Sequence, residues 1–228
     1  MRVTFVRPNL YDDRSTDAME PLCFAILKSL TPDDIDTVLI DERLEPVPAT
    51  LGTDLVAMTV ETYTARRSYQ LAARFRRQGI PVVFGGYHPT FLPDEALQHA
   101  DAIVVGDAED VWGQVLVDAG RSSLQRIYQS PEFPSLDAVM PDRSIFSGKK
   151  YAPMGLVQYA RGCKFNCSFC SIRAFYGNNL RQRPIESVVE DIRRSGRRHI
   201  FLVDDNLFVD VDKARQLFEA LRPLKVSW

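Results

Sequence analysis

The sequence lacks several features that would assign it to a common class of protein. It contains no apolar run near the ~18 residues that a membrane-spanning helix needs, and charged residues interrupt residues 1–7 too early for a signal peptide. It also lacks a basic excess, since 28 Lys and Arg stand against 30 Asp and Glu, a net charge of -2. Nucleic-acid binders usually carry such an excess. We therefore expect a cytoplasmic protein without a nucleic-acid partner.

Cysteine is scarce, and the motifs of several enzyme classes are missing. Four cysteines in 228 residues do not form a disulfide framework, and a chain with 45% hydrophobic residues can bury a core without one. There is no G-x-G-x-x-G fingerprint, no Walker loop and no nucleophile elbow. A basic cluster is formed by Arg193, Arg194, Arg197 and Arg198. We interpret it as a solvated helix end, with a local basic face as the alternative.

Strand and helix patterns alternate over residues 1–120. Short apolar runs predict five strands, at 3–6, 37–41, 55–60, 82–84 and 102–105. Helical periodicity lies between them, at 23–30, 62–78, 93–98 and 108–115. This order predicts an α/β fold with a doubly wound, Rossmann-like parallel sheet. Ligands of such sheets bind beyond the carboxyl ends of the strands, so we expect a site near Pro8–Asp13, Thr59–Thr62 and Gly85–Thr90.

The alternation stops over residues 121–154, where four prolines punctuate the chain and predict a linker. It restarts over residues 155–228, which we take as a second domain. Its predicted elements are a strand at 156–160, a helix from Pro184 to Gly196, a strand at 200–203, a helix capped by Asp212 and a strand opening at Lys225. A sheet that stops on an opening strand leaves an unpaired edge. We therefore expect this sequence to be a C-terminally truncated piece.

Three of the four cysteines cluster on one predicted loop between a strand and a helix. Cys163, Cys167 and Cys170 have the spacing C-x3-C-x2-C. Three thiolates this close suit an iron–sulfur cubane, in which the fourth iron stays open to a small molecule. Structural zinc is the alternative, but zinc needs four ligands, and the three histidines lie far away in the sequence. Cys23 falls on a predicted helical core face, where it is expected to be a small buried hydrophobe.

The cysteine spacing, with the aromatic Phe169 before the last cysteine, resembles the signature of the radical S-adenosylmethionine (SAM) enzymes. The resemblance covers residues 155–228 and implies the first part of a partial (βα) TIM-like barrel. It implies a [4Fe-4S] cluster on the three cysteines and SAM on the open iron. It also implies a flavodoxin- or ferredoxin-type electron donor and a small-molecule substrate. In this family, reductive cleavage of SAM gives a 5′-deoxyadenosyl radical. No further catalytic residue is assignable.

The same resemblance implies SAM contacts at the end of the strand predicted at 200–203. In the family this place contacts the SAM amino group, often through Gly-Gly-Glu, whereas this chain has Asp204, Asp205 and Asn206, as in relatives with a cobalamin domain. Carboxylates suit an ammonium partner. The alternative is a polar strand end that makes turn bonds. Phe169 is expected to pack by the adenine, or simply to fill core.

Residues 1–120 resemble the cobalamin (B12)-binding domain of B12-dependent radical SAM enzymes. The similarity rests on Val82-Val-Phe-Gly-Gly-Tyr-His-Pro-Thr-Phe-Leu-Pro-Asp-Glu-Ala and on Ala102-Ile-Val-Val-Gly-Asp-Ala-Glu. It implies cobalamin contacts from Thr59, Glu61, Thr62, Gly85, Gly86 and His88. The D-x-H-x-x-G motif that supplies a cobalt ligand in many B12 proteins is missing after the first strand, as in many radical SAM relatives. The alternative is a degenerate domain, with Gly85 and Gly86 as a turn and His88 on the surface.

The residues and both resemblances together predict a cobalamin-dependent radical SAM enzyme. It would transfer a methyl group to an unactivated carbon or phosphorus, or rearrange a carbon skeleton. A methylthiotransferase is one alternative, but it would need a second cluster in the first domain, where Cys23 is the only cysteine. An iron–sulfur electron carrier or scaffold is another, and its cluster would not respond to SAM. A truncated chain is expected to turn over poorly by itself.

Overall fold

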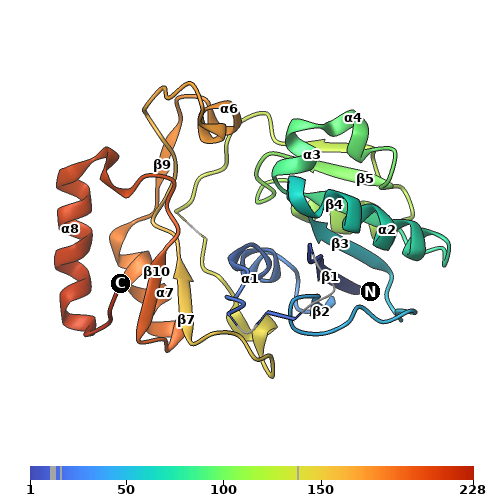
Figure 1. Ribbon diagram of the computed structural model, residues 1–228, viewed down its shortest axis with the longest axis horizontal. Helices are drawn as coiled ribbons and strands as arrows, with labels where there is room; N and C mark the ends of the chain where they lie inside the picture. Colours follow the sequence, from blue (N-terminus) through green and yellow to red (C-terminus); the bar gives the residue numbers. More distant parts are fainter. Residues whose placement is uncertain (11–13, 16, 138) are drawn as a thin grey trace.

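A computed structural model describes residues 1–10, 14–15, 17–137 and 139–228 and shows six parallel strands in one sheet (Figure 1). The strands are β1 (Arg2–Arg7), β2 (Asp36–Asp41), β3 (Leu55–Thr59), β4 (Val82–Gly85), β5 (Ala102–Val105) and β6 (Ile127–Gln129). Their order is β2-β1-β3-β4-β5-β6, so the direction of winding reverses between β1 and β3. The predicted doubly wound α/β sheet is confirmed. The sequence reading missed β6, which lies in the predicted linker, because three edge residues carry no periodic signal.

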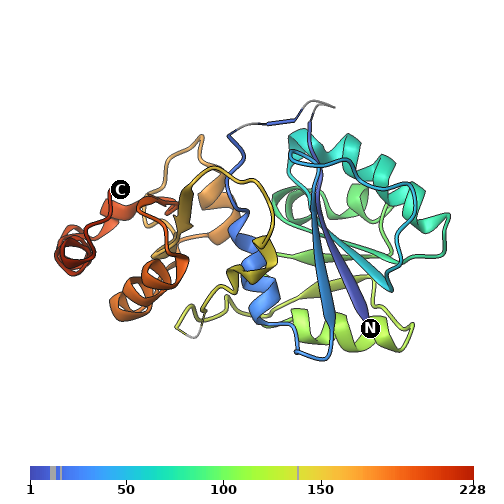
Figure 2. The ribbon, with the colours of Figure 1, turned by 90° about the horizontal axis from the view of Figure 1, so that it is seen from below.

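Helices cover both faces of this sheet (Figure 2). One face packs against α1 (Leu22–Ser29), α5 (Trp112–Gly120) and the 3-10 turn η2 (Arg143–Phe146), and the other against α2 (Ala65–Arg76), α3 (Tyr87–Phe91) and α4 (Pro93–Ala96). Neighbouring strand residues alternate between the two layers. In β3, Leu55 and Ala57 belong to the first layer, whereas Val56 and Met58 belong to the second. Burial on both sides explains why these strands read as continuous apolar runs.

Helix α1 is buried on two sides, and this overturns the expectation for Cys23. The sheet covers Phe24 and Ala25, while Leu22 and Ile26 pack in a separate cluster with residues from the segment before β7. Figures 1 and 2 show α1 lying between the sheet and the C-terminal part of the chain. The prediction that Cys23 is a buried hydrophobe is wrong, because Cys23 occupies the one side of the helix that neither layer covers and is exposed.

The helix predicted at 62–78 is shorter than expected, and it buries a different face. Its first turn is the 3-10 element η1 (Thr62–Thr64), and α2 ends at Arg76. Ser68, Leu71 and Phe75 are buried with Ala65 and Ala72, whereas the expected core residue Ala73 is exposed and Tyr69 is half-buried. The buried face was mispredicted because one of its positions is a serine. The Ser68 hydroxyl is buried and donates to the Thr64 carbonyl oxygen (2.9 Å).

A second, smaller unit follows the sheet domain. Strand β7 (Met154–Val157) pairs in parallel with β10 (His199–Leu202), and α7 (Ile185–Ser195) and α8 (Val211–Leu221) belong to the same core. Its buried residues are Val157, Tyr159, Ala160, Val188, Ile192, Ile200, Leu217 and Leu221. Ser227 makes an isolated parallel bridge to His199, and no strand is formed from Lys225 onward in the described residues, although one was predicted to open there. This strand–helix alternation is the expected first part of a (βα) barrel.

The strand predicted at 156–160 is two strands in two sheets. Strand β7 ends at Val157, and β8 (Ala160–Gly162) pairs antiparallel with β9 (Leu180–Gln182). The cysteine loop and α6 (Ser171–Tyr176) lie between β8 and β9. We call residues 160–182 the cluster hairpin. The reading missed the break because Val157 and Ala160 are both buried and the run between them looks continuous in sequence.

Helix ends in this unit differ from the predictions by one or two residues. Asp210, rather than Asp212, caps α8, because its carboxylate accepts a hydrogen bond from the Lys213 amide (3.1 Å). Pro184 precedes the first residue of α7 instead of occupying it. Gly196 ends α7 as predicted, with the left-handed φ of 62° that favours glycine.

The arginine cluster at the end of α7 is only partly solvated. Arg194 makes an exposed pair with Glu190 (2.8 Å), whereas Arg197 pairs with the buried carboxylate of Glu20 near α1. One guanidinium of the four is therefore used to join the two units, which weakens the local basic face. Within the described ranges, no helix is both long and apolar enough to cross a membrane.

Candidate cofactor site

The three clustered cysteines lie on the cluster hairpin, beyond the end of β8. Cys163 follows Gly162 directly, and Cys170 precedes the first residue of α6. Gly162 has a φ of +88°, and a Cβ at this position would overlap the carbonyl oxygen of Asn179 before β9. The hairpin therefore closes around a residue without a side chain. Local backbone geometry fixes where the cysteine loop starts.

The thiols form a donor set that fits a cluster better than a zinc ion. Cys163 and Cys170 are half-buried, Cys167 is exposed, and all three are free. No three His, Cys, Asp or Glu side chains of the described residues are grouped closely enough to hold a metal ion. Zinc would gather its thiolates about 2.3 Å from a single ion, whereas an iron–sulfur cluster gives each cysteine its own iron. The three free thiols of the motif are available as ligands, and the group that they hold stays a prediction.

The end of β10 meets the hairpin, as the sequence predicted. Asp204 accepts hydrogen bonds from the backbone amides of Tyr159 (3.1 Å) and Ala160, and Asp205 accepts one from the Gly162 amide (2.7 Å). Asn206 reaches the motif itself, because its Nδ2 lies 3.8 Å from the Cys163 sulfur. The alternative of local turn bonds holds only for the Asn206 oxygen, which accepts from the Phe208 amide (3.1 Å).

Burial makes these two carboxyl groups unusually basic. It raises the pKa of Asp204 to about 6, against the backbone hydrogen bonds from Ala160 and Tyr159 that lower it. Burial also raises the pKa of Asp205, opposed by the Gly162 amide and the charge of Arg161. An ammonium group beside them would favour the ionised forms. The pair thus has the chemistry expected of an amine-binding site, while its role toward SAM stays a prediction.

Phe169 projects from the cysteine loop. Its side chain is 89% exposed, so it does not fill core in this structure. Phe165, on the same loop, is 56% exposed. The expected contact between Phe169 and an adenine remains a prediction, and the exposed ring is free to make it.

A cavity of about 440 Å³ lies between the carboxyl ends of β1, β3, β4 and β5 and the cluster hairpin. Its floor is apolar and includes Ala57, Val83, Val104 and Trp112. Its other wall comes from the hairpin and includes Arg161, Phe175 and Tyr176. Four of the predicted cobalamin contacts line it, namely Thr59, Glu61, Gly85 and Gly86. These residues lie together at the strand ends, their contact with cobalamin stays a prediction, and the volume is typical of a ligand pocket.

Gly85, the last residue of β4, and Gly86, which follows it, have different structural roles. Gly86 has a φ of +104°, and a Cβ there would lie 3.0 Å from the Val60 carbonyl oxygen and 3.1 Å from Thr59 Oγ1. Glycine at this position serves the path of the backbone. A Cβ on Gly85 would make only an ordinary contact of 3.9 Å with Val104 and would occupy cavity space. Gly85 is therefore the glycine that leaves room for a ligand.

His88 and Thr62 do not line the cavity. The His88 ring is buried on the α2 and α4 side of the sheet, where its Nε2 lies 2.7 Å from the Tyr69 hydroxyl, which also donates to Glu95 (2.9 Å). Neither the cobalamin contact nor the alternative of a surface histidine fits this position, because α3 turns the ring into the core. Thr62 is exposed at the start of η1. Both assignments failed because residues that are adjacent in sequence face different layers.

Sequence reasoning missed Arg7 and Cys23, which also line the cavity. Burial raises the pKa of Glu61, and the charge of Arg7 opposes this shift. Burial also raises the pKa of the Cys23 thiol, since the thiol is open to the cavity but surrounded by protein. Arg7 could have been predicted as a site residue, because it is the last residue of β1 and ligands of such sheets bind at the carboxyl ends of the strands. Of the expected segment Pro8–Asp13, residues 11–13 lie outside the described ranges.

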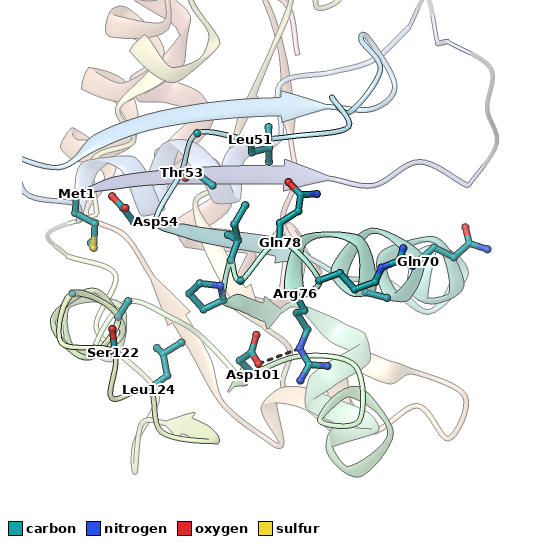
Figure 3. Close-up of a pocket in the computed structure, with 18 residues that line it drawn as sticks. Met1, Leu51, Thr53, Asp54, Gln70, Arg76, Gln78, Asp101, Ser122 and Leu124 are labelled. Atoms are coloured by element: carbon teal, nitrogen blue, oxygen red, sulfur yellow. Dashed lines mark hydrogen bonds and ion pairs between the residues drawn. The ribbon is translucent and has the colours of Figure 1, made fainter.

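A larger hollow, of about 1810 Å³, opens at the opposite, amino ends of the strands (Figure 3). Met1, Asp54 and Gln78 are among its lining residues, and an Arg76–Asp101 ion pair of 3.1 Å lies on its wall. Ligands of doubly wound sheets bind at the carboxyl ends, and the cysteine motif is at that end too. We therefore assign the candidate site to the smaller cavity.

Comparison with known proteins agrees with this fold and site. Residues 32–116 match the model of the B12 binding domain. A solved radical S-adenosylmethionine methyltransferase, TsrM from Kitasatospora setae, has the same fold, with a TM-score of 0.73 at 16% identity over 96% of this chain and 50% of its own. The fold and the family model thus define an α/β protein whose B12 binding domain precedes a loop with three clustered cysteines.

The curated relatives narrow this class. The bacteriochlorophyllide d C-8(2)-methyltransferase of Chlorobaculum tepidum is 33% identical over 95% of this chain and 52% of its own length. The C-12(1)-methyltransferase of the same organism is 29% identical over 91% and 48%, and the anaerobic magnesium-protoporphyrin IX monomethyl ester cyclase of Rubrivivax gelatinosus is 29% identical over 100% and 50%. The chain is therefore similar to methyltransferases and to a cyclase, and its residues 32–116 match the B12 binding domain. It spans about half the length of these relatives.

Proposed function

We propose that this chain is part of a cobalamin-dependent radical SAM enzyme that transfers a methyl group or rearranges a carbon skeleton. One observation carries the proposal: a single cavity is bounded by the B12 domain on one side and by the cysteine-bearing hairpin on the other. Relatives named as methyltransferases and as a cyclase support both reaction types. The substrate is expected to be a small molecule.

In this proposal, Cys163, Cys167 and Cys170 would hold a [4Fe-4S] cluster with one iron left open for SAM. The bound cluster would supply the electron for the reductive cleavage of SAM. Asp204 and Asp205 orient the SAM ammonium group by charge, with Asn206 beside the first cysteine. Phe169 covers the adenine from the exposed side of the loop.

Cobalamin is proposed to bind across the strand ends. Thr59, Glu61 and Gly85 contact it from the sheet domain, and Gly86 allows the backbone path that leaves space for it. The apolar floor excludes water from the buried part of the ligand, while Arg7 and Glu61 offer polar contacts at the rim. This mixture of apolar floor and few polar groups is typical of cofactor pockets.

The exposed cysteine loop also bears on the electron donor and the compartment. Cys167 and Phe169 are open to solvent, so an external flavodoxin- or ferredoxin-type partner can approach the cluster from this side. Free thiolates persist in reducing compartments. We therefore propose that the protein works in the cytoplasm.

Metal analysis tests the proposal first. The protein would be purified anaerobically, reconstituted with iron, sulfide and hydroxocobalamin, and assayed for iron, cobalt and zinc beside a Cys163→Ala/Cys167→Ala/Cys170→Ala variant. We expect about four irons per chain, lost in the variant, and about one cobalt. Cys23→Ala is the matched control and should keep the iron, since Cys23 lies in the cavity and not in the motif.

Each other outcome has a defined meaning. Zinc instead of iron, or no metal, contradicts the proposal. About eight irons would favour the methylthiotransferase, which carries two clusters. Iron without cobalt would leave the B12 domain without its proposed ligand. Adding SAM to the iron-loaded protein should change the electron paramagnetic resonance spectrum of the reduced cluster. An unchanged spectrum would favour an electron carrier or scaffold.

A further inference from the structure

The loop after β5 contacts the cluster hairpin through buried charges. Arg161, on β8, lies 2.7 Å from a Glu109 carboxylate oxygen and 3.2 Å from one of Asp107. Arg181, directly opposite Arg161 on β9, lies 2.8 Å from the other Asp107 oxygen as an ion pair without hydrogen-bond alignment. Two guanidinium groups of the hairpin thus converge on two carboxylates of the B12 domain.

This four-residue set is balanced and shielded from water. The side chains of Arg161, Asp107 and Glu109 are each exposed by less than a tenth. An arginine guanidinium stays charged inside a protein. Removing either carboxylate leaves a buried positive charge with less compensation, which is strongly unfavourable.

Aromatic contacts reinforce the same junction. The Tyr176 hydroxyl, at the end of α6, lies 3.5 Å from Asp107. Phe175 packs on Tyr87, with ring centroids 4.7 Å apart. Tyr87 directly follows Gly86 and is the first residue of α3. Elements on both sides of the cysteine loop, β8 and α6, therefore contact residues of the B12 domain that line the cavity.

We propose that Asp107 and Glu109 are positioning residues that set the orientation of the cysteine loop relative to the cobalamin cavity. Arg161 is separated from Cys163 by Gly162 alone, so a shift of its guanidinium is passed directly to the first cluster ligand. The Asp-Ala-Glu sequence at 107–109 then acts on the cluster without touching it. This inference rests on the proposed function, because it needs both cofactors at their proposed sites.

Hydrogen exchange on the cofactor-free protein tests the geometry. Glu109→Gln keeps the size of the side chain and removes its charge, and Asp118→Asn is the matched control, a buried carboxylate of the same domain that bonds Tyr128 and not the hairpin. We expect Glu109→Gln to speed amide exchange in β8 (Ala160–Gly162) by about tenfold. Exchange in β3 should not change. Asp118→Asn should leave β8 as it is.

A magnetic measurement on the loaded protein tests the role. The reduced cluster should speed relaxation of the cob(II)alamin signal in the wild type, and Glu109→Gln should weaken this effect while iron and cobalt contents stay the same. Glu109→Asp, which keeps the charge, should recover part of it. A merely structural carboxylate would not move this signal at constant metal content.

The outcomes separate the two proposals. If the wild type binds no iron or cobalt, the proposed function fails, while β8 exchange still reports on the junction. If both metals bind and Glu109→Gln shows wild-type exchange and relaxation, the positioning inference is wrong. If Glu109→Gln speeds exchange throughout the sheet, Arg181→Gln decides instead, because it removes the ion pair with Asp107 from the hairpin side, together with the Arg181 hydrogen bond to the Pro134 carbonyl oxygen, and leaves both carboxylates in place. Unchanged β8 exchange in that variant would also overturn the inference.

Discussion

The six-stranded sheet and the cluster hairpin differ in what holds them in place. Phe5, Leu55 and Phe84 of the sheet are fully buried, and apolar layers cover both of its faces. The hairpin has strands of three residues. It is held by charged contacts, chiefly those of Arg161 with Glu109 and of Asp205 with the Gly162 amide. Apolar burial dominates in the sheet, whereas in the hairpin directional polar bonds are added to the burial of Ala160 and Tyr176.

This difference matches the tasks of the two regions. Apolar burial supplies stability roughly in proportion to area and has no direction. Charged hydrogen bonds have defined geometry but contribute little net stability once desolvation is counted. A region that must hold a cofactor at a set angle benefits from the second kind of contact. The four predictions below test that division, beginning with the largest effect.

The core of the sheet should tolerate truncation least. Phe5→Ala removes a ring that packs on Phe24 and Trp112, at centroid distances of 5.3 and 5.7 Å. We expect a loss of about 3–5 kcal/mol in the free energy of unfolding, measured by urea denaturation. Val117→Ala on the exposed side of α5 is the control, with a change within about 0.5 kcal/mol. Similar losses of unfolding free energy in Phe5→Ala and Val117→Ala would contradict the view that apolar burial stabilises the sheet.

The hairpin should fail locally. Gly162→Ala places a Cβ against the Asn179 carbonyl oxygen at a φ of +88°, a strain of about 1–3 kcal/mol. We expect the reconstituted variant to lose most of its iron while the far-ultraviolet circular dichroism of the sheet domain is kept. Gly113→Ala, which meets nothing within 4 Å, should keep its iron. Full iron loading of Gly162→Ala would show that the hairpin adjusts more easily than its geometry implies.

Asp204 should give the hairpin region its own pH dependence. Its pKa is about 6 in the folded protein against an ordinary 3.8, so the native state binds more protons between these values. The stability gained from protonated Asp204 is present at low pH and is lost as the pH rises through about 6. Urea denaturation of the cofactor-free protein should therefore show the wild type losing stability relative to Asp204→Asn from pH 4 to pH 7. Parallel curves would contradict this.

The smallest effect on stability is expected at Phe169. The side chain is 89% exposed, so Phe169→Ala should change the free energy of unfolding by no more than about 0.5 kcal/mol. Its proposed role lies in SAM binding, which should weaken in an equilibrium titration of the iron-loaded protein. Phe165→Ala, from the same loop, is the control and should bind SAM as the wild type does. Equal weakening in both would mean that the loop as a whole matters.

Local patterns allowed most of the sheet and the cysteine loop to be predicted. Strand β3 is an apolar run bounded by turn residues, and the spacing of Cys163, Cys167 and Cys170 is a signal in itself. Short, half-exposed strands such as β6 gave no such signal. The cluster hairpin was missed for the same reason, because each of its strands has three residues.

Contacts between distant parts of the chain could not be predicted from local patterns. The pairing of Arg161 with Asp107 depends on where two separate units meet, and nothing near either residue encodes it. Periodicity placed Cys23 in a core, but α1 is covered from two directions, which a single helical stripe does not describe. The prediction for His88 failed for the same reason. The segment that carries it was correctly located at the strand ends, but the side of the sheet to which its ring points was not predicted.

The layer over α1 and α5 is completed late in the sequence. Ile145 and Phe146 belong to the same core cluster as Phe5 and Trp112, and Tyr151 packs on that cluster and donates to Asp41 of β2 (2.9 Å). During synthesis the amino-terminal part of a chain emerges first, yet this domain gains its last apolar cover only about a dozen residues before the cysteine motif. A fragment meant to fold as a B12-binding unit by itself should therefore extend through Tyr151, because one that stops at Gly120 would lack the apolar cover that Ile145, Phe146 and Tyr151 add to the Trp112 side of the sheet.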